Sequence, residues 1–190
     1  MSGGYGPVLS RAFFLRTAPE VARDLLGAVV VSTSGRTTTV GRIVETEAYL
    51  GAADPASHAF NGRRHASNEH LYSPPGTWYV YLSYGVHWCA NLVTGPRGVG
   101  AAVLIRGIEP LEGLPAIRRR RGKVPERHLA NGPGKLTQAL GITRTLDGQL
   151  MRTSNAIVRE GRAVPDDQVR ITARIGITRA TRWPLRFLAQ

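Results

Sequence analysis

Two carboxylates and a tyrosine alternate along one short stretch of this sequence: Glu45, Glu47 and Tyr49. The surrounding run, residues 38–49, is rich in Thr, Val and Ile, which predicts a β-strand. Side chains of a strand alternate between its two faces, so we expect Ile43, Glu45, Glu47 and Tyr49 to share a side. Two acids in such a run are unfavourable unless they are solvated, paired or used in chemistry. A carboxylate held in this way can activate a water molecule as a general base.

Aromatic residues and a histidine follow the acidic stretch. His58 comes soon after Tyr49, and residues 78–85 read Trp-Tyr-Val-Tyr-Leu-Ser-Tyr-Gly. Taken alone, each of these aromatic residues would more often belong to a core, and His58 would more often be an ordinary loop residue. Together with an acid, however, they provide what a pocket needs to stack a planar base and to activate a water beside it.

The rest of the sequence predicts the elements that position these groups. Thr17 and Glu20 have the spacing of a capping box, and Gly27 should end the helix that follows. Tyr84 and Gly85 separate two strand-like runs, so Tyr84 should lie at the tip of a hairpin. We expect strands at 28–32, 38–49, 77–82, 86–93, 101–108, 157–158 and 169–177, short helices at 110–121 and 135–140, a long polar loop at 51–76 and a flexible tail at 1–10. The predicted fold is one α+β domain spanning residues 1–190, with a curved, mostly antiparallel sheet, peripheral helices and a protruding hairpin.

The charge of the chain points to an anionic partner. Its 190 residues include 25 Lys plus Arg against 13 Asp plus Glu, which gives a net charge of +12. Only Lys123 and Lys135 are lysines, and arginine is the better bidentate ligand for phosphate. The excess indicates binding to nucleic acid or to another anionic surface, while a basic surface without a specific partner remains the alternative.

Cysteine usage and the absence of long apolar runs narrow the possibilities further. Cys89 is the only cysteine, which excludes an intramolecular disulfide, a zinc ribbon and a cysteine-ligated iron–sulfur cluster. It lies in an apolar run, so we expect a buried core residue. The N-terminal residues do not form a signal-peptide pattern, and no run of 18 apolar residues is present. We therefore expect a cytoplasmic protein, associated with the nucleoid if the source is bacterial, that does not enter a membrane.

In order and over nearly the whole chain, these motifs resemble the alkyladenine (3-methyladenine) DNA glycosylase family. The most specific feature is Glu45-Thr46-Glu47-Ala48-Tyr49 followed by the tyrosine-rich strand. The matching runs are residues 22–27, 41–49, 75–81, 84–85, 91, 103–110, 132–136 and 174–177. The resemblance implies a monomeric enzyme that flips an alkylated or deaminated purine (3-methyladenine, hypoxanthine or ethenoadenine) out of double-stranded DNA. It would hydrolyse the N-glycosidic bond with water and leave an abasic site, without a lyase step, a metal or a cofactor.

The resemblance also assigns roles to individual residues. Glu47 matches the general base, whereas Glu45 is expected to pair with an arginine. Asn91 matches a pocket residue whose amide would clash with the 2-amino group of guanine. Tyr49, His58 and Tyr81 match residues that bind the base in the pocket, and Tyr84 matches the residue that intercalates into the duplex. Lys135 and His87 are expected to contact the DNA backbone. Arg106 and the Ile175 carbonyl match catalytic groups that hold the water.

Some features depart from the family pattern or suggest other classes. Residues 179–184 are shorter than the family's Ala-Gly-Glu-Trp region and lack its Glu, and residues 95–100 are longer than in vertebrate members. Residues 132–134 superficially resemble a helix-hairpin-helix glycosylase, but the second helix pair and the downstream Asp are missing. His58, His65 and His70 lack the spacing of a metal site, so no metal is expected. A non-catalytic damage-binding or architectural DNA protein stays open. Glu47 beside Tyr49 favours catalysis, because binding alone needs no buried acid.

Overall fold

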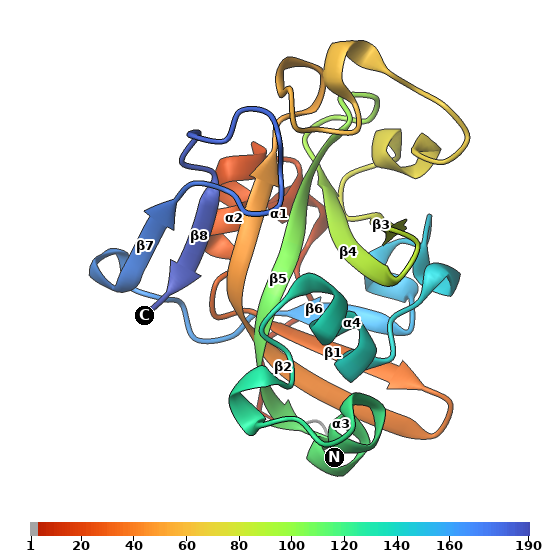
Figure 1. The fold of residues 1–190 in the computed structure, drawn as a ribbon, viewed down its shortest axis with the longest axis vertical. Helices are drawn as coiled ribbons and strands as arrows, with labels where there is room; N and C mark the ends of the chain where they lie inside the picture. Colours follow the sequence, from red (N-terminus) through yellow and green to blue (C-terminus); the bar gives the residue numbers. More distant parts are fainter. Residues whose placement is uncertain (1–3) are drawn as a thin grey trace.

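The computed structural model describes residues 4–190, in which eight strands form one antiparallel sheet (Figure 1). Its order is β3-β4-β5-β2-β1-β6, and β8 pairs with both β2 and β7. The strands are β1 (Val29–Ser34), β2 (Thr37–Tyr49), β3 (Trp78–Ser83), β4 (His87–Thr94), β5 (Ala101–Glu112), β6 (Ala156–Arg159), β7 (Val169–Thr172) and β8 (Arg186–Ala189). Every strand pair is antiparallel, which confirms the predicted α+β class with a curved antiparallel sheet.

Strand β2 is the centre of this sheet and carries the acidic stretch. Its first half pairs with β1, its second half pairs with β8, and β5 runs along its other edge. The β2–β5 register shifts on both sides of Glu45. Such irregularities change which face the following side chains point to. Ile43 therefore packs in the main core, and the prediction that it shares a side with Glu45, Glu47 and Tyr49 is wrong.

Among the described residues, four helices and several single 3₁₀ turns surround the sheet. The helices are α1 (Arg11–Phe14), α2 (Ala18–Asp24), α3 (Leu114–Arg121) and α4 (Pro133–Leu140); the 3₁₀ turns are η1 (Gly51–Ala53), η2 (Phe60–Gly62), η3 (Glu69–Tyr72), η4 (Glu126–His128), η5 (Arg144–Leu146), η6 (Met151–Thr153) and η7 (Asp166–Gln168). The capping box of α2 is present, since the Glu20 carboxylate accepts from the Thr17 backbone N–H at 3.0 Å. Within residues 4–190, no helix has both the length and the apolarity that crossing a bilayer requires.

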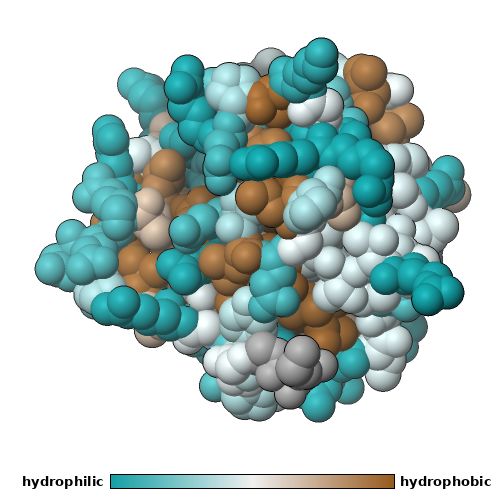
Figure 2. Space-filling model, turned by 90° about the horizontal axis from the view of Figure 1, so that it is seen from below, coloured by the Kyte–Doolittle hydropathy of each residue, from teal (hydrophilic) through white to brown (hydrophobic). Residues whose placement is uncertain are grey.

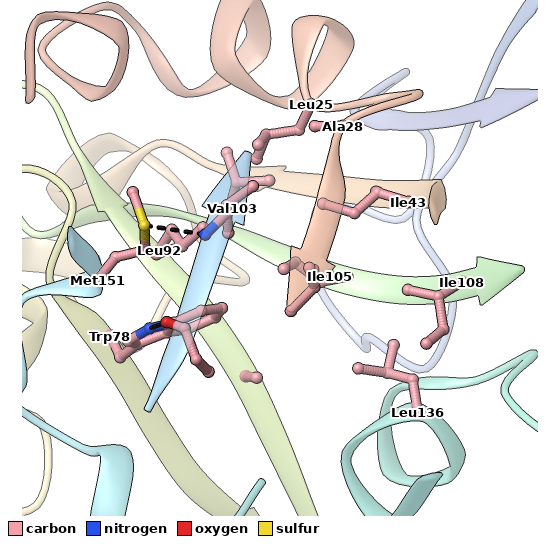
Figure 3. Packing of buried hydrophobic residues seen from close by; sticks show 14 of the residues in the cluster. Leu25, Ala28, Ile43, Trp78, Leu92, Val103, Ile105, Ile108, Leu136 and Met151 are labelled. Atoms are coloured by element: carbon pink, nitrogen blue, oxygen red, sulfur yellow. Dashed lines mark hydrogen bonds between the residues drawn. The ribbon is translucent and has the colours of Figure 1, made fainter. Parts of the chain in front are cut away.

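The main core fills the inside of the curved sheet. Figure 3 shows Leu25, at the end of α2, and Leu136, from α4, on the same core as Ile105 of β5. The buried Trp78 donates its indole N–H to the Ala156 carbonyl at 2.9 Å, which satisfies the polar atom of the largest core residue. A smaller cluster of buried residues lies apart from this core and includes Tyr79. That second cluster forms part of the wall described below.

Several predicted boundaries differ from the structure. Residues 1–3 lie outside the described part of the chain, but residues 6–10 are not a free tail, because Leu9 is buried and its N–H donates to Val158 at 2.9 Å. The predicted strand at 169–177 ends at Thr172, and the chain then loops to β8, which sequence reasoning missed together with α1. Strand β5 extends to Glu112, so α3 begins later than predicted.

Candidate active site

A cavity of about 690 Å³ opens where the acidic end of β2 meets two loops. One loop follows β2, and the other connects β7 to β8; both lie at the upper end of the molecule in Figure 1. Side chains from β2, β3, β4 and β5 complete the wall. The lining includes Tyr49, His58, Tyr79, Tyr81, Cys89, Asn91, Leu104, Arg106, Pro133 and Ile175. The structure therefore brings together residues that are far apart in the sequence.

Glu47 lies directly behind this wall and is completely buried. Its Oε2 accepts from the Tyr49 hydroxyl at 2.9 Å, and its Oε1 accepts from the Ile175 backbone N–H at 2.8 Å. Arg106 Nε lies 3.4 Å from the same Oε1. All three partners line the cavity, so the carboxylate is separated from it by a single layer of groups that touch it.

Burial and hydrogen bonding act on this carboxylate in opposite directions. Desolvation raises the pKa of Glu47 above its usual value, while Arg106, the Ile175 N–H and the Tyr49 hydroxyl lower it and leave a net rise. Desolvation and the neighbouring Glu47 raise the pKa of Tyr49 as well, so that hydroxyl stays protonated and donates. A carboxyl group whose pKa is raised by burial beside a cavity is a candidate for acid–base chemistry.

Glu45 is held in a different way from Glu47. Its Oε1 accepts from Arg106 Nε at 3.0 Å and from Arg186 Nε at 2.6 Å, which confirms the predicted pairing with arginine. Glu45 thus has two charged partners and does not line the cavity. Arg106 contacts both acids, so it connects the paired carboxylate to the one behind the cavity wall.

Three aromatic rings form one side of the cavity. The His58 ring meets Tyr81 edge-to-face with centroids 4.5 Å apart, and its Nδ1 is hydrogen-bonded to the Tyr79 hydroxyl at 2.8 Å. The His58 ring is open to the cavity, yet the protein around it desolvates the charged form and lowers its pKa, which favours neutral imidazole. Tyr79 was not singled out from the sequence, although its alternation with Tyr81 on one strand face was the signal for it.

Asn91 and Cys89 belong to the wall formed by β4. The Asn91 amide donates to the Tyr79 carbonyl at 3.1 Å and is almost completely buried, so its orientation is fixed. Cys89 is buried as expected, but it lies on the cavity side and outside both core clusters. The proposed clash of Asn91 with guanine stays a prediction.

The β3–β4 hairpin places Tyr84 at its tip, as the sequence predicts. Tyr84 and Gly85 both have left-handed backbone, with φ of 51° and 69°, and the Val86 N–H closes the turn on the Ser83 carbonyl at 3.1 Å. The Tyr84 side chain is 88% exposed and also lines the mouth of the cavity.

The beginning of α4 lies next to this hairpin. A side chain added at Gly134 would come within 2.7 Å of His87 Cβ, so the helix start and the exposed His87 are in close contact. Lys135 Nζ donates to the Asn131 side chain at 2.9 Å. The start of α4 is therefore near His87 and near the cavity mouth, where Pro133 forms part of the lining.

Ile175 contacts the buried acid through its backbone N–H, which donates to Glu47. The contact of its carbonyl with the catalytic water stays a prediction. The preceding residue, Arg174, is buried in a salt bridge with Asp54, which sequence reasoning missed. No motif links two residues 120 positions apart, so the sequence carried no signal for this pair.

The histidines considered as metal ligands have separate partners. His65 Nδ1 contacts Ser67, and His70 Nδ1 contacts Asp147, each at 2.8 Å. Over residues 4–190, no group of three or more His, Cys, Asp and Glu side chains is placed to hold a metal ion.

Comparisons with known proteins agree with this arrangement. A family model described as methylpurine-DNA glycosylase (MPG) matches residues 12–190. A protein of Burkholderia cenocepacia is 45% identical over 185 residues, which cover 94% of this chain and 87% of its relative. Another, from Methanoculleus marisnigri, is 46% identical over 182 residues, with 94% and 93% covered. Both carry the provisional name 3-methyladenine DNA glycosylase. The chain therefore belongs to the methylpurine-DNA glycosylase family, whose members act in the repair of alkylated bases in DNA.

Proposed function

We propose that this DNA glycosylase takes a damaged purine, such as 3-methyladenine, hypoxanthine or ethenoadenine, out of duplex DNA into the cavity and hydrolyses its N-glycosidic bond. The observation that carries the proposal is the Glu47 carboxylate, which is wholly buried behind Tyr49 and Arg106. Burying an acid in this way costs free energy that a site for binding alone would not need.

Water is the proposed nucleophile. A carboxylate has about four lone-pair directions, so hydrogen bonds from Ile175 and Tyr49 leave Glu47 able to accept a further proton. As the water oxygen attacks the sugar C1′, its proton passes to Glu47 and the electron pair of the glycosidic bond leaves with the base. This step requires the layer of Tyr49, Arg106 and Ile175 that covers Glu47 to admit the water when the substrate binds. The negative carboxylate also stabilises the positive charge that develops on the sugar.

Aromatic side chains that line the cavity supply the binding energy for the extruded base. Stacking on Tyr49, His58 and Tyr81 is worth roughly 1–3 kcal/mol per base, which offsets most of the few kcal/mol that unpairing costs. A damaged or mismatched base is easier to extrude than an intact one, and this difference contributes to selectivity.

A strand-cleaving reaction would require an amine that forms a Schiff base with the sugar. The amines of the chain are Lys123, Lys135 and the N-terminus; neither lysine lines the cavity, and we propose a monofunctional enzyme. Borohydride added during turnover should trap no covalent adduct between protein and DNA. A trapped adduct would show that an amine, and not water, attacks the sugar.

The decisive experiment is incubation with duplex DNA that carries one hypoxanthine, 1,N6-ethenoadenine or 3-methyladenine, followed by alkali to cut abasic sites. An undamaged duplex of the same sequence is the control. The proposed enzyme leaves an abasic site at the lesion only. A non-catalytic damage-binding protein, which is the second candidate, gives a complex with the lesion but no abasic site.

A further inference from the structure

We infer that Asp54 and Arg174 act as a positioning pair that holds the Ile175 amide against the Glu47 carboxylate and Tyr49 against the cavity. This inference rests on the proposed function, in which Glu47 is the general base. Neither residue lines the cavity, so both would act through the groups that do.

The pair itself is fully enclosed, and the buried Arg174 Nε has no hydrogen-bond partner among the described residues. Both side chains are completely buried, and Arg174 donates to the two Asp54 oxygens at 2.5 and 2.8 Å. The first donating atom, Nη1, also reaches the Ala48 carbonyl at 3.0 Å. A buried ion pair repays the cost of desolvating its charges only with good geometry and further hydrogen bonds, and replacing it with apolar residues often stabilises a protein. A contribution to stability is thus a weak explanation for this one.

Each half of the pair organises a segment that contributes to the active site. Asp54 accepts the backbone N–H groups of Leu50 and Ala56 at 3.1 and 3.0 Å, which shapes the loop between β2 and His58. Arg174 lies 4.6 Å from the centre of the Tyr49 ring, in a cation–π contact. Tyr49 in turn donates its hydroxyl to Glu47.

The pair also anchors the start of the loop between β7 and β8. Strand β7 ends at Thr172 and β8 begins at Arg186, so the sheet does not hold Arg174 or Ile175. The contacts of Arg174 with Asp54 and Ala48 fix this point of the loop next to β2. The following amide, that of Ile175, then points at Glu47 Oε1 at 2.8 Å. Releasing the pair should therefore release this hydrogen bond.

The consequence for Glu47 can be distinguished from a simple effect of charge. Glu47 faces Arg106 on β5, Glu45 and Tyr49 on β2, and the Ile175 amide, while Arg186 on β8 faces Glu45. The Ile175 hydrogen bond lowers the pKa of Glu47, so losing it raises that pKa whichever partner of the pair is removed. If the two charges acted on Glu47 through space alone, loss of the Arg174 cation would raise the pKa of Glu47, and loss of the Asp54 anion would lower it.

The test compares Arg174→Gln and Asp54→Asn in single-turnover base release from duplex containing hypoxanthine, measured across pH. We expect both variants to bind the lesion and to lose about 100-fold in rate at neutral pH, as a displacement of about 1 Å at the reacting groups can cause. We also expect the acid limb of both profiles to move to higher pH. The double variant Asp54→Asn/Arg174→Gln, which leaves a neutral amide pair, provides a folded alternative if a single change prevents folding, and its acid limb should move in the same direction.

Arg23→Gln and Asp166→Asn are matched controls, because this ion pair also joins distant segments but lies away from the cavity. Their pH profiles should equal that of the wild type. Acid limbs that move in opposite directions for the two single variants, or that do not move in the variants that fold, would overturn the positioning role.

A second measurement does not depend on catalysis. Hydrogen exchange of the Ile175 amide should accelerate in both Arg174→Gln and Asp54→Asn, but not in the controls, and unchanged exchange would overturn the inference. If the wild type released no base, the proposed function would fail while this measurement still decided whether the pair holds the amide. If Glu47→Gln were as fast as the wild type, only the role of Glu47 would be lost.

Discussion

At the scale of single residues, two glutamates two positions apart have opposite environments. Glu45 lies between Arg106 and Arg186, whereas Glu47 is enclosed and has a raised pKa that is caused mainly by desolvation. Divergent environments of this kind are how one protein gives two carboxylates different roles. Glu47 should therefore be needed for chemistry, whereas Glu45 serves as a charged partner of Arg106 and Arg186.

The first prediction separates these roles. Glu47→Gln should keep lesion binding but reduce base release on the order of 10²–10⁴-fold, the usual contribution of a positioned base. Glu45→Gln should keep most activity, because Arg106 retains its contact with Glu47. Single-turnover kinetics with excess enzyme measure the chemical step directly. Equal rates for Glu47→Gln and the wild type would show that Glu47 is not the base.

The second prediction concerns stability. The pKa of Glu47 is raised in the folded state. The contribution of this group to the free energy of unfolding is therefore complete at pH values below its pKa in the unfolded chain. It is lost as the pH rises through the folded pKa, since the folded state must then bury a charge. Glu47→Gln should therefore have a higher Tm than the wild type at pH 7. This difference should shrink as the pH falls below the folded pKa of Glu47; a lower Tm for the variant at pH 7 would contradict the argument.

Residue-scale features were predictable only where they are local. Strand alternation predicts that the side chains of Glu47 and Tyr49 lie on the same face of β2, and the hydrogen bond between them confirms this. The buried Asp54–Arg174 pair could not be predicted, because it forms only when two loops meet in the fold. The Ile175 amide is a backbone group, and its direction depends on the same loop contact.

At the scale of elements, the β3–β4 hairpin is built to expose an apolar tip. Leu82, Tyr84 and Val86 are 44%, 88% and 68% exposed. A bulky residue with a positive φ costs of order 1–3 kcal/mol, and such strain is often found at functional sites. The hairpin was predictable from its turn residues. The bend of β2 was not, because the sequence does not mark the register shifts around Glu45.

The third prediction concerns this tip. Tyr84→Ser should slow base release from paired duplex, because nothing then fills the space left by the extruded base. The free-energy barrier should rise by a few kcal/mol at most. The defect should shrink when the lesion lies opposite a gap, where extrusion costs least. Glu47→Gln serves as the control, since its defect lies in chemistry and should not be rescued. If Tyr84→Ser were equally impaired on both substrates, the residue would belong to the pocket instead of acting as a wedge.

At the scale of the whole molecule, positive charge is distributed over much of the sequence, whereas the candidate active site is a single cavity. Figure 2, seen from below the view of Figure 1, shows hydrophilic side chains projecting over much of that face. With a net charge of +12, long-range attraction to DNA should be strong and sensitive to salt. The sequence predicts the sign of this attraction, but it could not identify which cations lie near the cavity mouth. Arg118, Arg120 and Arg121, for example, are engaged with Glu126 or with backbone carbonyls.

The fourth prediction assigns one of these cations to the DNA backbone. Lys135 lies at the start of α4, which approaches His87 through Gly134 and contributes Pro133 to the cavity lining, and helix dipole and charge there both favour a phosphate. Affinity for DNA should fall with salt at a log–log slope of about −0.9 per neutralised phosphate, so Lys135→Ala should flatten the slope by about one such contact. It should weaken lesion-containing and plain duplex to the same extent, because phosphate contacts carry no base information. Arg170→Ala, which removes an exposed cation from β7 and away from the cavity, should leave the slope unchanged. A change in the ranking of lesions by Lys135→Ala would instead place Lys135 among the residues that read the base.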